Sequence, residues 1–273
     1  MRLKNKVVIV TGGGGGIGTG VAQAMAQEGA AVCIADVETL DSDLNQFQNK
    51  TLGGYTAAKN LSKQLVKEGL KATAIEVDVT QWDMVTTMVE KAVEAYGRVD
   101  ILVNAAGVIT AGGEAAELSI EDWDVVMTVN AKGTFLTNKA VIPQMRRQRK
   151  GKIINFASVA GKMGAQFLSH YAASKGAVLA FSNTLALELA KENITVNCVC
   201  PGIVPTQMWK LVGSAFGGGP GEIAEEFRRN VVEMTVPMGI DILPEDLAEA
   251  VIYLATADHV TRQSLNVDGG TSY

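Results

Sequence analysis

Short, unbroken runs of apolar residues alternate with helical patterns along almost the whole of this 273-residue chain. The first run, residues 6–10, is followed by an Ala-rich stretch that ends at Gly29, and a second run follows at 31–36. Strands that are apolar on both faces are typical of parallel sheets covered by helices. We therefore predict an α/β fold in which a doubly wound sheet of about seven parallel strands has helices on both faces.

The same alternation predicts the remaining elements. Further strands are expected over 72–77, 99–104, 152–156, 195–199 and 264–267, and helices over 17–28, 61–68, 82–96, 120–149, 171–191 and 244–256.

The length favours a single domain over residues 1–273. Two segments interrupt the pattern. Residues 38–59 are polar and exceed the about 2 to 6 residues of an ordinary connection, so we interpret them as an insertion. Residues 202–237 contain a glycine-rich run and follow a strand, which suits a lid over a substrate site.

Composition narrows the classes of partner. The formal net charge is −5, with 24 Lys and Arg against 29 Asp and Glu, which argues against nucleic-acid binding. The apolar run 7–10 is too short for a signal sequence or a membrane span, so we expect a cytoplasmic protein without membrane association. With three cysteines, no CxxC pair and two histidines, neither a disulfide framework nor a metal site is expected.

A glycine-rich loop, Thr11 to Gly18, lies between the first strand and the first helix. Backbone without side chains lets a pyrophosphate approach the free N–H groups at the start of a helix. Gly12, Gly16 and Gly18 fit the pattern G-x-x-x-G-x-G, which we prefer to the overlapping G-x-G-x-x-G. A flexible turn without a ligand is the structural alternative.

Asp36 ends the second strand, eighteen residues after Gly18. A carboxylate there accepts hydrogen bonds from the adenosine ribose and repels a 2′-phosphate. Neither the two following residues nor the glycine loop holds Arg or Lys, which NADP would require. We therefore predict NAD as the cofactor; the alternative is that Asp36 is only a turn residue.

Tyr171 and Lys175 are spaced as i and i+4, on one face of a predicted helix. A free tyrosine has a pKa near 10, and proton transfer at neutral pH calls for lowering it by about 2 to 3 units. We expect the Lys175 ammonium to supply much of this. Ser158 follows the predicted strand 152–156 and Asn104 stands at the end of the predicted strand 99–104, at the sheet edge where ligands bind.

Taken together, Thr11–Gly18 (TGxxxGxG), Asn104–Gly107 (NAAG) and Tyr171–Lys175 (YxxxK) resemble the short-chain dehydrogenase/reductase family. Asn130, Ser158 and the Pro201-Gly202 pair also match, and the resemblance runs from Lys6 to Gly270. It implies a Rossmann-type domain. The segment 38–59 departs from the family pattern; it either borders the adenosine end or makes an oligomer contact.

The resemblance implies a role for each matching residue. Tyr171 would be the general acid/base, Ser158 would hold the substrate oxygen, Lys175 would assist the phenol and bind the nicotinamide ribose, and Asn130 would hold a water. The cofactor would contact Gly12, Gly16, Ile17, Gly18, Asp36, Asp78, Val79, Asn104, Ala105, Gly107, Tyr171, Lys175, Pro201, Gly202, Ile203 and Thr206. Asn104 has an alternative role within the central sheet.

For the substrate we expect contacts from Ser158, Gln166, His170, Tyr171 and Trp209. Gln166 and His170 are alternatively solvated loop residues, and Trp209 alternatively packs in the lid. Mostly apolar walls suit a small secondary alcohol, diol or polyol, or the matching ketone.

Two other functions stay open. The enzymatic alternative is a 3-oxoacyl reductase or 3-hydroxyacyl dehydrogenase acting on a carrier-protein or CoA thioester, which a basic patch beside the pocket would favour. The basic run 146–150 is more simply the favourable charge at a helix end. A non-catalytic dinucleotide sensor or structural subunit is disfavoured because Tyr171, Lys175 and Ser158 are all present. The resemblance also implies a homotetramer or homodimer, formed through the helix 171–191 and residues 265–273.

Overall fold

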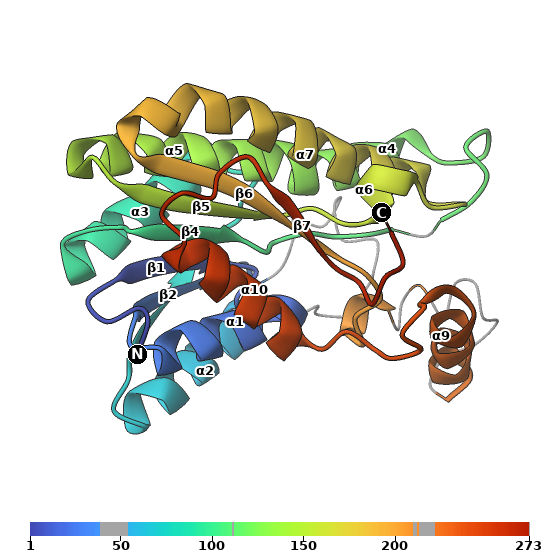
Figure 1. Ribbon diagram of the computed structural model, residues 1–273, viewed down its shortest axis with the longest axis horizontal. Helices are drawn as coiled ribbons and strands as arrows, with labels where there is room; N and C mark the ends of the chain where they lie inside the picture. Colours follow the sequence, from blue (N-terminus) through green and yellow to red (C-terminus); the bar gives the residue numbers. More distant parts are fainter. Residues whose placement is uncertain (39–53, 111, 210–211, 213–221, 273) are drawn as a thin grey trace.

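Seven parallel strands form one sheet in the order β3-β2-β1-β4-β5-β6-β7 (Figure 1). The computed structural model describes residues 1–38, 54–110, 112–209, 212 and 222–272. The strands are β1 Val7–Thr11, β2 Ala31–Asp36, β3 Lys71–Glu76, β4 Ile101–Asn104, β5 Gly151–Phe156, β6 Ile194–Pro201 and β7 Ser264–Val267.

Helices cover both faces of this sheet (Figure 1). They are α1 Gly16–Gln27, α2 Tyr55–Lys67, α3 Trp82–Tyr96, α4 Ile120–Val126, the π-helix η1 Met127–Gly133, α5 Thr134–Gln148, α6 Ala160–Met163, α7 Ser169–Leu189, the 3-10 helix η2 Ala190–Glu192, α9 Glu222–Thr235 and α10 Pro244–Thr256. None of the helices described is long and apolar enough to cross a membrane.

Each face of the sheet has its own apolar core. Val8 and Val10 of β1 pack with α1, α2 and α10, whereas Ile9 between them packs with α3, α5 and α7. The inner strands are therefore buried on both sides, which explains their unbroken apolar sequence. The prediction of a doubly wound parallel sheet is confirmed, and the strand order reverses between β1 and β4, where such sheets bind ligands.

Two predicted boundaries are wrong. Helix α2 begins at Tyr55, so residues 55–59 are helical and the expected insertion 38–59 is shorter; its residues 39–53 lie outside the described part of the chain. The first turn of α2 is mostly polar, so the helical spacing of its buried residues Ala58, Leu61 and Leu65 was not recognised in the sequence. The expected continuous helix over 120–149 is interrupted by the π-helix η1, whose backbone spacing the hydrophobic pattern does not reveal.

A buried amide network joins the two central strands to the helices above them. Asn155 of β5 accepts hydrogen bonds through Oδ1 from Asn104 Nδ2 at 2.8 Å and Asn138 Nδ2 at 3.1 Å. Its own Nδ2 donates to Ser182 Oγ of α7 at 2.8 Å. Asn155 is fully buried, so these bonds have no competition from water.

Replacing Asn155 by alanine is expected to lower the free energy of unfolding by about 2 to 4 kcal/mol, because several buried polar groups lose their partner. Urea unfolding monitored by circular dichroism measures the change. Asn60→Ala, which truncates an exposed amide on α2, is the matched control and should change stability by no more than about 0.5 kcal/mol. Equal losses for the two variants would contradict the role assigned to the network.

Candidate active site

Several positions of the glycine loop between β1 and α1 are packed so closely that they have no room for a Cβ atom. Gly12 has φ 67°, and a Cβ there would lie 2.7 Å from the backbone nitrogen of Ala106. A Cβ on Gly18 would overlap the carbonyl oxygen of Gly12. Gly15 caps α1 without a side-chain hydrogen bond, which leaves N–H groups of the first turn for a ligand. This cradle fits the pyrophosphate of a dinucleotide.

Asp36 lies beside this loop at the end of β2. Its Oδ2 accepts a hydrogen bond from Gly14 N and its Oδ1 one from Val37 N, both at 2.8 Å. Burial raises the pKa of Asp36, while these backbone hydrogen bonds act to lower it. The structure therefore places the Asp36 carboxylate beside the glycine loop, where the sequence predicts it.

Asp78, which follows β3, is buried, and its Oδ1 accepts hydrogen bonds from the backbone and hydroxyl of Thr80, both at 2.8 Å. Val79 packs in an apolar cluster that Tyr171 also contacts. The side chain of Asn104 is committed to the amide network described above, which is the alternative role considered for it.

Gly107 lies against two of the predicted catalytic residues. A Cβ at this position would lie 3.2 Å from Asn130 Oδ1 and 3.4 Å from Lys175 Nζ. Ala105, two residues earlier, donates its backbone N–H to Thr11 O at 3.2 Å. The NAAG segment therefore holds the glycine loop on one side and borders Lys175 on the other.

Tyr171, Lys175 and Ser158 are brought together where α7 crosses the end of β5. Lys175 Nζ donates to the carbonyl oxygen of Phe156 at 3.0 Å and lies 5.7 Å from the centroid of the Tyr171 ring. The Ser158 hydroxyl acts to lower the pKa of the Tyr171 phenol, which places the two groups close together. A phenol, a hydroxyl and an ammonium are thus gathered at the carboxyl ends of the strands, as predicted.

The electrostatic balance differs from the expectation. Burial raises the pKa of Tyr171 to about 12, against the opposing effect of the Ser158 hydrogen bond. Burial also lowers the pKa of Lys175 to about 8. The net shift of the Tyr171 pKa is therefore upward, opposite to the expected lowering, because burial is the largest effect on the phenol.

Asn130 lies in the π-helix and is fully buried. Its Nδ2 donates to Val108 O at 2.9 Å and to Ser174 Oγ at 3.0 Å, and its Oδ1 accepts from Val108 N at 2.8 Å. Ser174 in turn donates to the carbonyl oxygen of Tyr171 at 2.8 Å. The Asn130 side chain therefore positions α7. The sequence analysis did not predict the role of Ser174, although this serine lies within the YxxxK segment. It also did not predict that the Phe156 carbonyl binds Lys175, because no sequence pattern indicates a backbone contact of this kind.

The segment after β6 folds back toward the glycine loop. A Cβ on Gly16 would lie 3.2 Å from Thr206 Cγ2, and Ile203 O accepts a hydrogen bond from Ile242 N at 3.2 Å. Pro201 O accepts from Val159 N, and Gly202 is packed against Asp268. Of the expected lid 202–237, residues 210–211 and 213–221 lie outside the described residues, and α9 forms its last part.

The residues predicted to contact the substrate differ in their exposure to solvent. Gln166 is exposed and Trp209 is half-buried. His170 is fully buried, with its Nε2 2.9 Å from Thr110 Oγ1. Among the residues that the structure describes, no three His, Cys, Asp or Glu side chains gather as a metal ion would require.

A dinucleotide-binding fold that gathers a phenol, an ammonium and a hydroxyl at its strand ends defines the class of oxidoreductases acting on CH–OH groups. The family model described as "short chain dehydrogenase" matches residues 6–215, and the chain belongs to this short-chain dehydrogenase/reductase family. The family binds a nicotinamide dinucleotide and acts on small molecules.

Individual relatives match over nearly the whole length of the chain. The chain is 37% identical to the 3-oxoacyl-[acyl-carrier-protein] reductase FabG of Thermotoga maritima, over 99% of each chain. It is 36% identical to the galactitol 2-dehydrogenase of Agrobacterium fabrum, over 99% of this chain and 98% of the relative. The crystal structure of levodione reductase matches with a TM-score of 0.88 and 25% identity, over 98% of both chains.

His170 makes folding sensitive to acid. Its burial lowers the pKa below the ordinary value of 6.5, so the unfolded chain binds a proton more readily than the folded chain. This contribution to stability is complete above pH about 6.5 and is lost as the pH falls through the lowered pKa of the folded state. In urea unfolding between pH about 7.5 and 5.5, we expect His170→Gln to lose less stability than the wild type. Thr110→Ser, which keeps the imidazole and a hydroxyl partner, should follow the wild type; equal slopes for His170→Gln and the wild type would disprove the role of His170.

Proposed function

We propose that this enzyme transfers a hydride between NAD and a small secondary alcohol, diol or polyol, or the matching ketone, with Tyr171 as the proton-transfer residue. The observation that carries the proposal is the position of the Lys175 ammonium 5.7 Å from the centroid of the Tyr171 ring, with the Ser158 hydroxyl acting to lower the pKa of the same phenol. Oxygen charge develops when a carbonyl gains or an alcohol loses a hydride, and a hydroxyl donor and a proton carrier stabilise it.

The protonation states of the site residues suit this reaction. With its pKa raised to about 12, the Tyr171 phenol is neutral at neutral pH and is a proton donor for a ketone oxygen. Ser158 would donate a second hydrogen bond to that oxygen. Lys175, held by Phe156 O, stabilises the phenolate that remains. Asn130 binds Ser174 and so positions α7, the helix that carries Tyr171 and Lys175. Because the Asn130 side-chain amide is already hydrogen-bonded, any water that Asn130 holds would bind its backbone carbonyl.

The cofactor would supply the hydride or accept it. The glycine cradle from Gly12 to Gly18 would hold its pyrophosphate, and Asp36 would bind the adenosine ribose hydroxyls. Asp78 and Val79 would border the adenine, and the segment from Pro201 to Thr206 would border the nicotinamide. The Asp36 carboxylate is the reason to propose NAD rather than NADP, because it would repel a 2′-phosphate.

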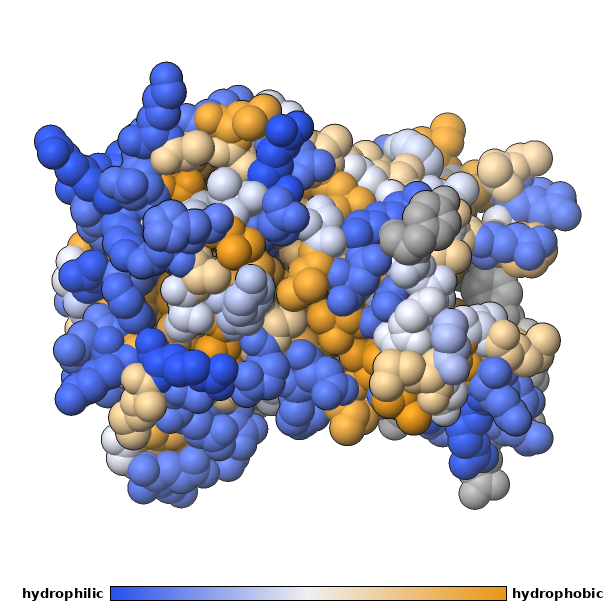
Figure 2. Space-filling model, in the orientation of Figure 1, coloured by the Kyte–Doolittle hydropathy of each residue, from blue (hydrophilic) through white to orange (hydrophobic). Residues whose placement is uncertain are grey.

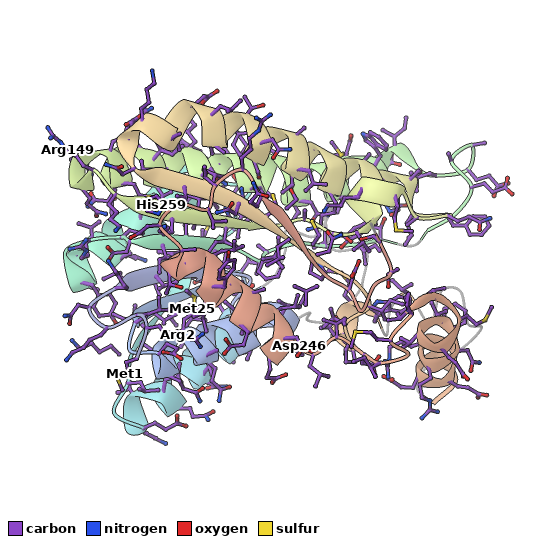
Figure 3. The ribbon with its side chains drawn as sticks, viewed as in Figure 1. Met1, Arg2, Met25, Arg149, Asp246 and His259 are labelled. Atoms are coloured by element: carbon purple, nitrogen blue, oxygen red, sulfur yellow. The ribbon has the colours of Figure 1, made fainter. Side chains whose placement is uncertain are left out.

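A 3-oxoacyl thioester is the second candidate substrate, because the Thermotoga maritima relative is a 3-oxoacyl-carrier-protein reductase. The position of the basic run 146–150 counts against it. Figure 3 shows Arg149 at the end of the molecule opposite α9, and Arg146 is paired with Glu192 at 2.8 Å. These charges are remote from Tyr171 and are not placed to receive an acidic carrier.

Exposed apolar side chains on α5 and α7, Phe135 and Leu187, support the proposal of a homo-oligomer.

Tyr171→Phe is expected to lower kcat/KM by about 100-fold or more, because the variant cannot exchange a proton with the substrate oxygen. NADH formation with a panel of secondary alcohols and diols measures it, alongside NADH oxidation with a 3-oxoacyl thioester. Alcohol oxidation should quicken as the pH rises, since the phenol must first lose its proton. Tyr253→Phe on the exposed face of α10 is the control. Full activity of Tyr171→Phe refutes the proposed chemistry; turnover of the thioester alone favours the second candidate.

Asp36→Ser is expected to reduce the preference for NAD over NADP by about tenfold or more, equivalent to about 1.4 kcal/mol, because repulsion of the 2′-phosphate is removed. The ratio of kcat/KM for the two cofactors measures the preference. Glu90→Gln removes an exposed carboxylate on α3 and should leave the ratio unchanged. A wild-type enzyme that prefers NADP would overturn the assignment of NAD.

A further inference from the structure

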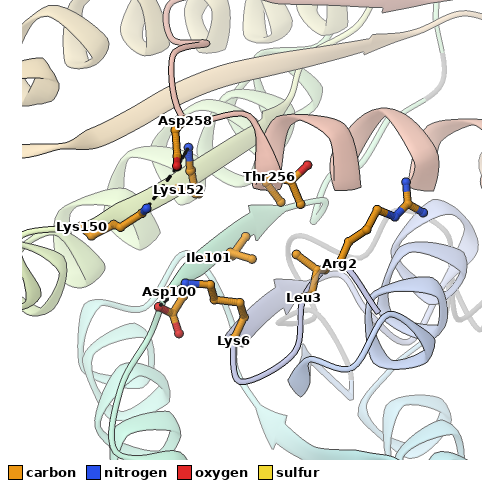
Figure 4. A pocket seen from close by; sticks show the side chains of 10 residues that line it. Arg2, Leu3, Lys6, Asp100, Ile101, Lys150, Lys152, Thr256 and Asp258 are labelled. Carbon is orange, nitrogen blue, oxygen red and sulfur yellow. Dashed lines mark ion pairs between the residues drawn. The ribbon is translucent and has the colours of Figure 1, made fainter.

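A cavity lies at the end of the sheet where the strands begin, opposite the carboxyl ends that carry the predicted site residues. Figure 4 shows the side chains that line it. It has a volume of about 160 Å³ and lies between the N-terminal segment, the connection from α5 to β5, and the end of α10. Lys6, Lys150 and Lys152 line it together with Asp100 and Asp258. Strongly hydrophilic residues cover this end of the molecule in Figure 2.

Asp100 does not need the lysines of the cavity. Its carboxylate accepts hydrogen bonds from Val7 N at 3.0 Å and from Arg98 Nε and Nη2 at 2.8 and 2.7 Å. Lys6 Nζ lies 3.7 Å from Asp100 Oδ1, beyond hydrogen-bonding distance. The nearest carboxylate to Lys6 is therefore already neutralised by another cation.

The other two lysines share one carboxylate oxygen. Lys150 Nζ and Lys152 Nζ each lie 3.2 Å from Asp258 Oδ1. Lys152 is nearly buried and also donates to the carbonyl oxygen of Ala257 at 2.6 Å. With Arg98 included, four cations meet two carboxylates here, which is a local surplus of positive charge in a chain whose net charge is −5.

The three ammonium groups act on one another across the cavity. Burial lowers the pKa of Lys152, and the charges of Lys150 and Lys6 lower it further against the opposing effect of Asp258. Repulsion between like charges in a partly buried site is relieved when an anion lies between them.

We propose that this cavity binds a small phosphate-type oxyanion, which accepts hydrogen bonds from Lys6, Lys150 and Lys152. Lysine ammonium groups bind phosphate as point charges, and a doubly charged oxyanion matches the surplus of two positive charges. The bound anion would tie the N-terminal segment to the start of β5 and the end of α10. Arg2 is not a ligand, because it is paired with Glu28 and Glu249 where it lies between α1 and α10 (Figure 3).

Thermal unfolding with inorganic phosphate, against chloride of equal ionic strength, tests the site. NADH is present throughout, so that the glycine loop is not available to phosphate. At about 10 mM phosphate and a Kd of about 1 mM, we expect the Tm of the wild type to rise by about 3 °C. In Lys6→Gln and Lys150→Gln, the Kd from calorimetric titration should increase about tenfold. Lys91→Gln, an exposed lysine of α3, should keep the wild-type Kd.

Two outcomes would overturn the proposal. One is a wild-type Tm that does not respond to phosphate. The other is an equal response in all four proteins, which would place the bound phosphate elsewhere. Circular dichroism verifies that the variants are folded, which their partly exposed side chains allow.

Discussion

The hydrogen bond from the Asn104 amide to the Asn155 side chain joins the two central strands at the point where both carry functional loops. Ala105 and Ala106 follow Asn104 and pack against Gly12 of the glycine loop, while Phe156 and Ser158 follow Asn155. Because Asn155 also binds Asn138 and Ser182, the same side chain sets the positions of α5 and α7 above the sheet. Buried amides without access to water hold such an arrangement to one geometry.

Helix α7 is fixed in turn by two contacts that differ in kind. Lys175 reaches down to the Phe156 carbonyl, and Ser174 links the first turn to Asn130 of the π-helix. The π-helix widens the turn at Asn130 and directs its amide toward Val108. The phenol of Tyr171 is therefore positioned by residues that lie on three different elements, and its proton affinity is set by how thoroughly those elements exclude water.

The two ends of the sheet have contrasting electrostatics. At the carboxyl ends of the strands, backbone N–H groups and the Asp36 carboxylate border the glycine loop. At the opposite end, lysines outnumber the carboxylates they contact around a cavity. Only the first arrangement follows from the strand topology, because the carboxyl ends of parallel strands are where loops converge on a ligand.

The sequence by itself determined the parallel sheet, the glycine loop, Asp36 at the end of β2 and the pairing of Tyr171 with Lys175. These features depend on local patterns: apolar runs, glycine spacing and the i, i+4 spacing of a helix. The tertiary structure alone decided the π-helix at Asn130, the burial of His170 against Thr110 and the contact of Lys175 with Phe156 O. It also reversed the expected direction of the Tyr171 pKa shift. Such features depend on which distant segments exclude water from a group, and desolvation is a property of packing that no local spacing encodes.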